Sequence, residues 1–212
     1  MGERPKLWSF DRKTEVEAVD RATSNQEYRE LCYRVIDAVL EIREKGQVRP
    51  ENLDAFAEAV ECSYEWVFSS GGRRLSECSY FVPEAGQRLL DLMSSPKWRV
   101  RLNTVAIMDY RPREDILLLV LRKGLEDQSA KVRKLAVGKI LGLKLLQLLG
   151  AMETRSGVEK DAETLEYLNQ TINWLQGKPA MMDGKPMWFV WCKDGHSTTL
   201  SEEDPAKSGH GI

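Results

Sequence analysis

A repeated Val-Arg pair constrains the fold of this chain more than any other feature of its sequence. Val100-Arg101 recurs 32 residues later as Val132-Arg133, and Val105 recurs at the same spacing as Val137. Each pair stands four or five residues into a predicted helix that follows a shorter one. A fixed period of this size is typical of folds in which helix pairs stack and bury their apolar faces against their neighbours. The sequence therefore predicts an all-α fold, a short stack of antiparallel helix pairs.

Apolar residues at three- and four-residue spacing place the individual helices. The first predicted helix follows Ser24 and ends near Gly46, and the second runs from about Pro50 to Phe68, where Gly71-Gly72 stops it. Residues 73–82 read as a connection. Further helices are predicted at 84–93, 97–110, 114–123, 130–149 and 161–176.

The two ends of the chain lack the periodicity of the helical region. Residues 1–23 are predicted to form an irregular N-terminal segment, 24–176 a helical-repeat domain, and 201–212 a disordered tail. Between these last two, Asp194-Gly195 separates an aromatic, β-branched run from Thr198-Thr199-Leu200, which is a strong hairpin signal. Because two strands alone are marginal in water, a small hairpin over 177–200 is expected to pack on the helices.

The repeat resembles that of HEAT-repeat proteins. Residues 127–133, from Asp127 to Arg133, are similar to the D-x-x-x-V-R signature at the turn into the second helix of a HEAT pair, with one extra residue between Asp and Val. Residues 94–101 are similar too, with Ser in place of Asp. The resemblance covers about 83–149 and implies a HEAT-like stack. It also implies that Arg101 and Arg133 pair with the signature Asp127 and hold neighbouring repeats in register.

Charge is unevenly distributed along the chain. Residues 97–144 hold twelve basic and five acidic residues, a net charge of +7, whereas the whole chain carries −2. Arg99 and Lys131 are one repeat apart, and so are Arg101 and Arg133. Arg99, Lys131 and Lys134, with Trp98 beside them, are therefore the residues predicted to contact a partner that carries an acidic surface or phosphates.

A second resemblance gives the alternative function. The run Trp98-Arg99-Val100-Arg101 with Ala106-Ile107, and residues 133–138 further on, are similar to segments of HEAT-like alkylpurine DNA glycosylases. That family binds duplex DNA on a basic concave face and needs an acidic residue after an upstream tryptophan. Here Trp66 is followed by Val67-Phe68-Ser69-Ser70, without an acid. This departure puts the catalytic residue of the family in doubt.

Aromatic residues crowd the last part of the chain. Trp174, Trp188, Phe189 and Trp191 lie within 18 residues. Alternation along a strand places Trp188 on one face of the hairpin, and Phe189 and Trp191 mostly on the other. One face can pack on the last helix, and the other either meets a second core layer or is exposed. An exposed aromatic patch would mark a protein interface, so Trp188 and Trp191 are also predicted as binding residues.

The sequence contains no clear pattern of catalytic or metal-binding residues. Cys192 and His196 are the nearest approach to a Cys–His pair, but a structural zinc site needs four ligands. Gly71-Gly72 lacks the strand and the Gly-Lys-Ser/Thr of a phosphate loop. The prediction is no catalytic residue, no metal and no cofactor. Four scattered cysteines and no apolar leader or long apolar stretch predict a cytoplasmic protein that is not inserted in a membrane.

Together these features predict a non-enzymatic protein-binding module, such as a scaffold, an adaptor or a bacterial immunity-type protein, whose partner has an acidic surface. The alternative is a nucleic-acid-binding protein or a HEAT-like DNA glycosylase that uses the basic 97–134 face.

Overall fold

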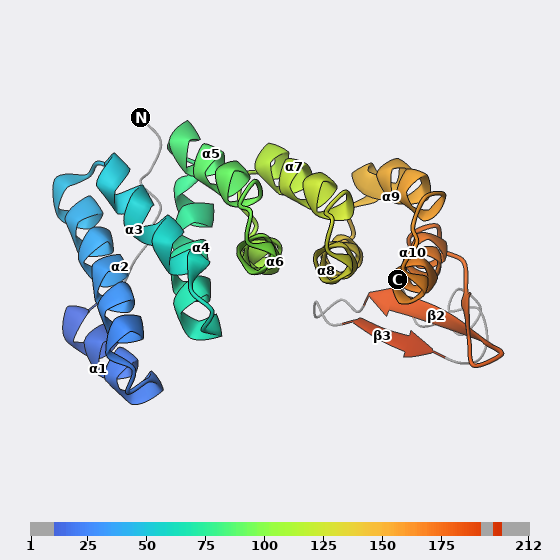
Figure 1. Cartoon of the computed structure of the whole chain (residues 1–212), viewed down its shortest axis with the longest axis horizontal. Helices are drawn as coiled ribbons and strands as arrows, with labels where there is room; N and C mark the ends of the chain where they lie inside the picture. The colour runs from blue at the N-terminus through green and yellow to red at the C-terminus, as the bar shows by residue number, and fades with distance from the viewer. Residues whose placement is uncertain (1–10, 192–196, 201–212) are drawn as a thin grey trace. The chain divides into compact units, whose positions relative to one another are not determined.

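A computed structural model of the chain describes residues 11–191 and 197–200. These residues belong to two compact units, one ending at Ile116 and the other beginning at Leu117. Both units are helical, and a small antiparallel sheet follows the last helix (Figure 1). The predicted all-α fold with a small C-terminal hairpin is confirmed. The helical region predicted as one domain, 24–176, is divided between the two units.

The first unit is built around helix α3, which packs against both α2 and α4 (Figure 1). Its core consists of apolar side chains that lose nearly all contact with water, among them Val39, Phe56, Val67, Leu75 and Leu89. Burial of such side chains is the main favourable contribution to folding. Its elements are α1 (Arg12–Ala22), α2 (Gln26–Lys45), α3 (Pro50–Glu61), α4 (Glu65–Cys78), α5 (Pro83–Leu92), α6 (Trp98–Ala106) and the 3-10 turn η1 (Ile107–Tyr110).

Helix α1 corrects the prediction of an irregular segment over 1–23. Asp11 caps it by accepting a hydrogen bond from the Thr14 backbone N–H at 3.1 Å. Val19 is the only buried residue in α1, so the helix has no apolar stripe that a sequence pattern could reveal. Its contacts with α2 include polar ones, such as the 3.2 Å ion pair between Arg12 and Asp37. Residues 1–10 lie outside the described part of the chain.

Helix α2 buries the apolar stripe that its sequence predicts. Leu31, Val35 and Ile42 are all buried on the side that faces the core. The helix ends at Gly46, which adopts the left-handed conformation (φ 67°) and donates its N–H to the Ile42 carbonyl at 2.8 Å. The N-terminal cap is Asn25, one residue after the predicted Ser24.

Helix α4 corrects the prediction that Gly71-Gly72 ends a helix. The preceding helix α3 stops earlier, at Glu61, and α4 continues through both glycines to Cys78. A Cβ on Gly71 would clash with the Phe56 carbonyl oxygen and lie 2.7 Å from Cβ of Ala59. A Cβ on Gly72 would lie 2.7 Å from Cβ of Ile107. The glycines therefore permit close helix packing, at the helix-propensity cost that glycine carries.

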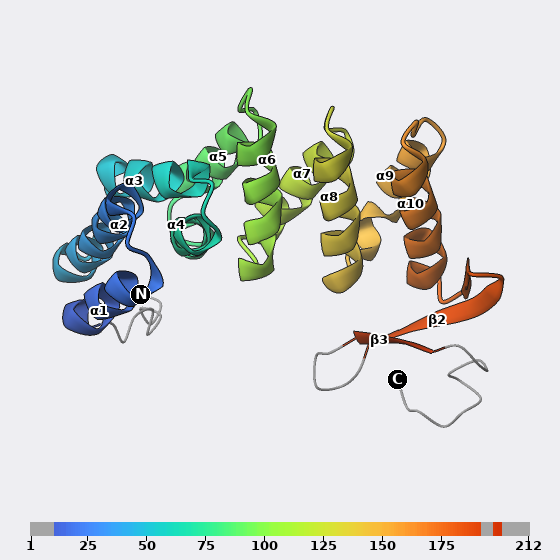
Figure 2. The same cartoon turned by 60° about the horizontal axis from the view of Figure 1, so that its bottom comes forward.

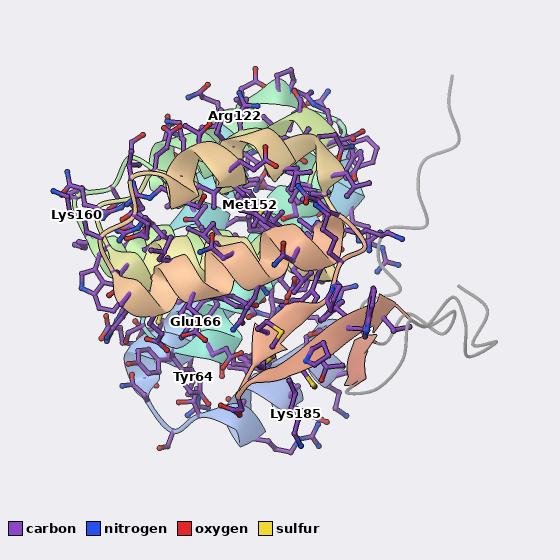
Figure 3. The ribbon with its side chains drawn as sticks, turned by 90° about the vertical axis from the view of Figure 1, so that its right-hand side faces the viewer. Tyr64, Arg122, Met152, Lys160, Glu166 and Lys185 are labelled. Carbon is purple, nitrogen blue, oxygen red and sulfur yellow. The ribbon has the colours of Figure 1, made fainter. Side chains whose placement is uncertain are left out.

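The second unit contains α8 (Ala130–Gly142), the 3-10 turn η2 (Leu146–Leu148), α9 (Leu149–Ser156) and α10 (Ala162–Leu175), and α7 (Glu114–Leu125) crosses the boundary between the units. The single helix predicted over 130–149 is wrong: α8 ends at Gly142, and Lys144, two residues later, adopts a left-handed conformation (φ 53°) that no continuing helix could contain. Figure 3 shows Met152, which is fully buried, in the layer between α9 and α10. Helices α8 and α10 run side by side (Figure 2).

The 32-residue period extends to a third helix. The residues that cap α6, α8 and α10 are Lys97, Ser129 and Asp161, each 32 residues after the last. Positions three and seven after each cap are buried in all three helices: Val100 and Thr104, Val132 and Ala136, Thr164 and Leu168. Helix α4 buries Val67 and Gly71 at the same positions after its cap Tyr64. One burial pattern therefore describes all four helices.

The C-terminal sheet has the strand order β1-β2-β3, with β1 (Ala180–Met182), β2 (Lys185–Trp191) and β3 (Ser197–Leu200). Strands β2 and β3 pair antiparallel, Phe189 opposite Thr199, as a hairpin requires. The predicted turn residues Asp194-Gly195 lie outside the described residues. Strand β1 was not predicted, although Asp183-Gly184, both with positive φ, carries the same hairpin signal before β2.

Glycine packing in α4 makes a first prediction. Gly71→Ala is expected to lower the free energy of unfolding by about 2–3 kcal/mol, since the new methyl group overpacks against α3. Gly142→Ala is the control, because a Cβ added there would meet no atom within 4 Å and alanine favours the helix. Urea unfolding followed by circular dichroism measures both. Equal stability of the two variants would contradict the packing role of Gly71.

Candidate functional site

Trp98 and Arg99 form the first turn of α6 in the first unit. Trp98 exposes 38% of its surface, and Cζ of the exposed Arg99 lies 5.6 Å from the centre of its ring. The preceding Lys97 reaches the end of α3, where its Nζ lies 3.8 Å from Glu61 Oε2. An indole ring with a guanidinium over it offers a partner both an apolar face and a hydrogen-bonding cation.

Arg101 and Arg133 perform the same local task, each within its own unit. Arg101 donates from Nη1 to the carbonyl oxygens of Ser95 (2.7 Å) and Pro96 (3.3 Å). Arg133 donates from Nη1 to the carbonyl oxygens of Asp127 (2.9 Å) and Gln128 (3.0 Å). Both arginines therefore satisfy carbonyls five and six residues earlier, in the turn that leads into their helix.

The carboxylate partner of Arg133 is Glu159, which the sequence analysis missed. Arg133 donates from Nε and Nη2 to the two Glu159 carboxylate oxygens at 2.7 and 2.5 Å, and Arg155 donates to the same carboxylate at 2.9 Å. Asp127, the predicted partner, supplies its main-chain carbonyl, and its side chain accepts a hydrogen bond from the Ser129 N–H at 2.8 Å. Arg133 therefore contacts the main chain of Asp127, and the carboxylate that it binds is that of Glu159.

Glu159 is the buried centre of this cluster. Its side chain has no exposed surface, and its Oε1 also accepts the backbone N–H groups of Lys160 (3.0 Å) and Asp161 (2.9 Å). Hydrogen bonds from Arg133 and Arg155 hold the pKa of the Glu159 carboxyl well below its usual range. The donors come from α8, α9 and the start of α10, so the cluster joins these three helices. Because donors surround both carboxylate oxygens, no acceptor is left for a ligand.

Lys131 and Lys134 lie on α8, Lys131 exposed and Lys134 partly exposed. Lys134 forms an ion pair with Glu163 of α10. Lys131 and Arg99 belong to different units, so their predicted stacking into one basic ladder stays a prediction. The ion pairs of Lys97 with Glu61, Arg113 with Asp115, and Lys134 with Glu163 reduce the positive charge that the 97–144 stretch offers a partner.

Acidic side chains line a groove between α2 and α3. The groove has a volume of 740 Å³, and five carboxylates border it beside a single arginine, Arg34, which pairs with Glu58 at 2.6 Å. The acidic residues are Glu27, Glu30, Asp37, Glu58 and Glu61. Glu61 is also the partner of Lys97, so the turn before Trp98 adjoins a negatively charged surface.

The C-terminal aromatics divide between the two faces of the sheet. The rings of Trp174 and Phe189 pack with their centres 5.3 Å apart, and Trp174 Nε1 donates to the Met187 carbonyl at 2.9 Å. Phe189 therefore faces α10, and the alternation of the strand directs Trp188, which is half-buried, to the opposite face. Trp191 ends β2, and its side chain lies outside the described part of the structure.

The cysteines of the first unit are poor nucleophiles. Cys32, Cys62 and Cys78 are buried free thiols, and burial raises the pKa of both Cys32 and Cys78 to about 12. Within residues 11–191 and 197–200, no three His, Cys, Asp or Glu side chains are grouped as a metal site would need. Cys192 and His196 lie outside this part of the chain. In the same residues, no helix is both long and apolar enough to cross a membrane.

Three exposed aromatic residues that the sequence analysis did not single out lie on two turns of the first unit. Tyr80 and Phe81 follow α4 and expose 56% and 51% of their surfaces, and Tyr110 ends η1 with 39% exposed. Tyr80 Oη donates to the Arg111 carbonyl at 2.7 Å, which places the two turns side by side. The sequence feature that could have indicated this surface is the adjacent pair Tyr80-Phe81, which stands in a stretch without helical periodicity.

No family model, no curated protein and no solved structure matches this chain. The resemblances to HEAT-repeat proteins and to alkylpurine DNA glycosylases therefore rest on the motifs of the sequence alone.

Replacement of Arg133 gives a second prediction. Arg133→Met should lower the free energy of unfolding by about 3–5 kcal/mol, since Glu159 keeps its burial and loses its bidentate partner. Lys134→Met is the matched control on the next residue of α8, and should cost about 1 kcal/mol or less, because its ion pair is partly exposed. Urea denaturation compares the two. A smaller loss for Arg133→Met than for Lys134→Met would contradict the structural role of Arg133.

The pH dependence of stability gives a third prediction. The pKa of Glu159 is lower in the folded than in the unfolded chain, so its stabilising contribution is present above the unfolded pKa, about 4.3. It is lost as the pH falls from there towards the folded pKa. The stability difference between the wild type and Glu159→Gln should therefore shrink between pH 6 and pH 3. Glu163→Gln is the exposed control, and a constant difference for Glu159→Gln would refute the assignment.

Proposed function

We propose that this chain is a non-enzymatic protein-binding module and that its partner contacts Trp98 and Arg99. The observation that carries the proposal is the exposed tryptophan with a guanidinium over its ring at the start of α6. Tryptophan and arginine are the residue types most often found at the energetic centres of protein interfaces.

The turn that presents Trp98 is held in place before any partner binds. Arg101 ties it to the carbonyls of Ser95 and Pro96, and Asn103 donates its side-chain amide to the carbonyls of Val60 (2.8 Å) and Cys62 (2.7 Å) at the end of α3. A preorganised contact loses less conformational entropy on binding, which favours affinity.

The partner we propose has an acidic surface next to an apolar contact. Arg99 is exposed beside Trp98, and Lys131 and Lys134 on α8 extend the basic character of the 97–134 region into the second unit. Trp188, half-buried on the sheet face opposite α10, and Trp191 remain further candidate contacts of that unit. A scaffold, an adaptor or an immunity-type protein of the cytoplasm fits this description.

Nucleic-acid binding or glycosylase activity is the alternative proposal. The basic residues at 97–134 favour it. Two ion pairs weigh against it: Lys97 is bound to Glu61 and Lys134 to Glu163, and a nucleic acid needs many available cations at once. Trp66, on the first turn of α4, is followed by no acid that could act as the catalytic residue of the glycosylases.

Affinity enrichment with matched tryptophan variants tests the proposal. A partner that binds the wild-type protein is expected to bind Trp98→Ser at least about 30-fold more weakly, the loss typical of an interface hot spot of 2 kcal/mol. Trp66→Ser is the control, since Trp66 has a nearly equal exposed fraction (36%) on the first turn of α4. Isothermal titration calorimetry with the captured partner measures both.

Duplex DNA provides the opposing outcome. The protein is titrated with duplex DNA between about 50 and 200 mM salt. If its affinity for DNA falls steeply over this range, and if the double variant Arg99→Glu, Lys131→Glu no longer binds DNA, the nucleic-acid alternative replaces the proposal. Equal binding of a protein partner to wild type and Trp98→Ser would also remove Trp98 from the interface.

A further inference from the structure

A second exposed surface of the first unit lies on the turn that follows α4 and on η1, which follows α6. Tyr80, Phe81 and Tyr110 each expose between 39% and 56% of their surface. Most other aromatic and aliphatic side chains of this unit are buried or half-buried. Scattered single apolar residues are normal on a protein surface, but here three large exposed aromatic residues lie on two adjoining turns.

Both turns are held rigidly by hydrogen bonds. Tyr80 Oη donates to the carbonyls of Arg111 (2.7 Å) and Pro112 (3.3 Å). Ser79, which is fully buried, donates its hydroxyl to the Ser76 carbonyl at 2.7 Å and accepts the Arg113 N–H at 2.9 Å. These bonds fix the backbone of the two turns and the ring of Tyr80, so less of this surface has to be ordered when a ligand binds.

Charged side chains of both signs adjoin these rings, and the acids Asp109 and Glu114 have interactions within the chain. The other arginines near the two turns have acidic partners: Arg73 and Arg74 bind Glu77, and Arg113 binds Asp115 at 2.6 Å. Arg111 is exposed, and no carboxylate of the described residues lies within ion-pair distance of it. A ligand that covers the rings would therefore find an arginine available for its own carboxylate.

The backbone of Arg111 indicates that this arginine does not serve the local fold. Its φ is +48°, in the left-handed region, where a side chain with a Cβ costs about 1 kcal/mol or more and glycine costs nothing. Its backbone N–H donates to the Met108 carbonyl at 3.0 Å, and a glycine would keep that bond. Stability alone therefore favours glycine at position 111.

We propose that Tyr80, Phe81, Tyr110 and Arg111 form a docking surface for a segment of a partner protein that presents an apolar side chain next to Asp or Glu. The apolar side chain packs on the rings, and the carboxylate pairs with the guanidinium of Arg111. This inference goes beyond the proposed function, because it names a second surface whose residues include neither Trp98 nor Arg99.

The probe is a peptide selected by phage display. A random library of 12-residue peptides is screened against the full chain. Enriched peptides are expected to carry an aromatic or aliphatic residue within two positions of Asp or Glu. Their affinity, measured by fluorescence anisotropy with labelled synthetic peptides, should fall at least tenfold for Phe81→Ser and for Arg111→Gly. The melting temperature of Arg111→Gly should equal or exceed that of the wild type, which separates loss of binding from loss of fold.

Two control variants distinguish this surface from the rest of the unit. Trp66→Ser removes an exposed aromatic residue elsewhere and should leave peptide affinity unchanged. Trp98→Ser should also leave it unchanged, so this surface and the Trp98 interface can fail independently. The inference is overturned if no peptide is enriched, or if the enriched peptides lack acids or bind Arg111→Gly normally. Self-association of the wild type that Phe81→Ser abolishes would replace the partner segment with a second copy of the chain.

Discussion

The hydrogen bonds that one arginine makes to the turn before its own helix are the interaction on which the turns into α6 and α8 depend. A turn between two helices leaves main-chain carbonyls that must find donors when they are partly buried. Arg101 and Arg133 supply these donors from the fourth residue of α6 and α8, to carbonyls five and six positions earlier. In the second unit the same guanidinium also binds Glu159, so one side chain closes its turn and anchors the next helix.

This use of arginine changes how the charge of the chain relates to its function. A count of charges over 97–144 describes a strongly basic stretch, but Arg101 and Arg133 donate to carbonyls, and Lys97, Arg113 and Lys134 form ion pairs within the chain. Long-range attraction of a polyanion depends on the net charge of the whole region, and Glu61 and Glu163, which lie outside 97–144, lower that charge around Lys97 and Lys134. Contacts of short range are affected much less. Exposed aromatic rings with an arginine beside them are therefore a better basis for recognition here than charge alone.

The sequence could predict what depends on local periodicity and could not predict what depends on packing between distant residues. The stripe of α2, the glycine that ends it, the 32-residue period and the β2–β3 hairpin all follow from spacing. Gly71-Gly72 reads as a helix stop, and only the contacts with Phe56 and Ile107 show that both glycines lie inside α4. Glu159 stands 32 residues after Asp127, but the recognised motif ends at residue 149, so the predicted repeat neither reaches this acid nor connects it with Arg133. The exposure of Tyr80 and Phe81 is likewise a property of the fold, since an aromatic pair in a loop is just as often buried.

Residues that the fold itself would not select are the most informative about function. Three residues other than glycine have positive φ in the described chain: Arg111, Lys144 and Asp183. Asp183 precedes Gly184 in a two-residue hairpin turn, where aspartate is a favoured residue. Lys144 follows the end of α8 and has interactions within the chain. Arg111 caps η1 in the left-handed conformation, so the end of the helix accounts for its positive φ. It does not account for the choice of arginine at a position that glycine favours, and the exposed guanidinium has no acidic partner among the described residues. That choice of residue, beside three exposed aromatic rings, is the observation on which the proposed docking surface rests.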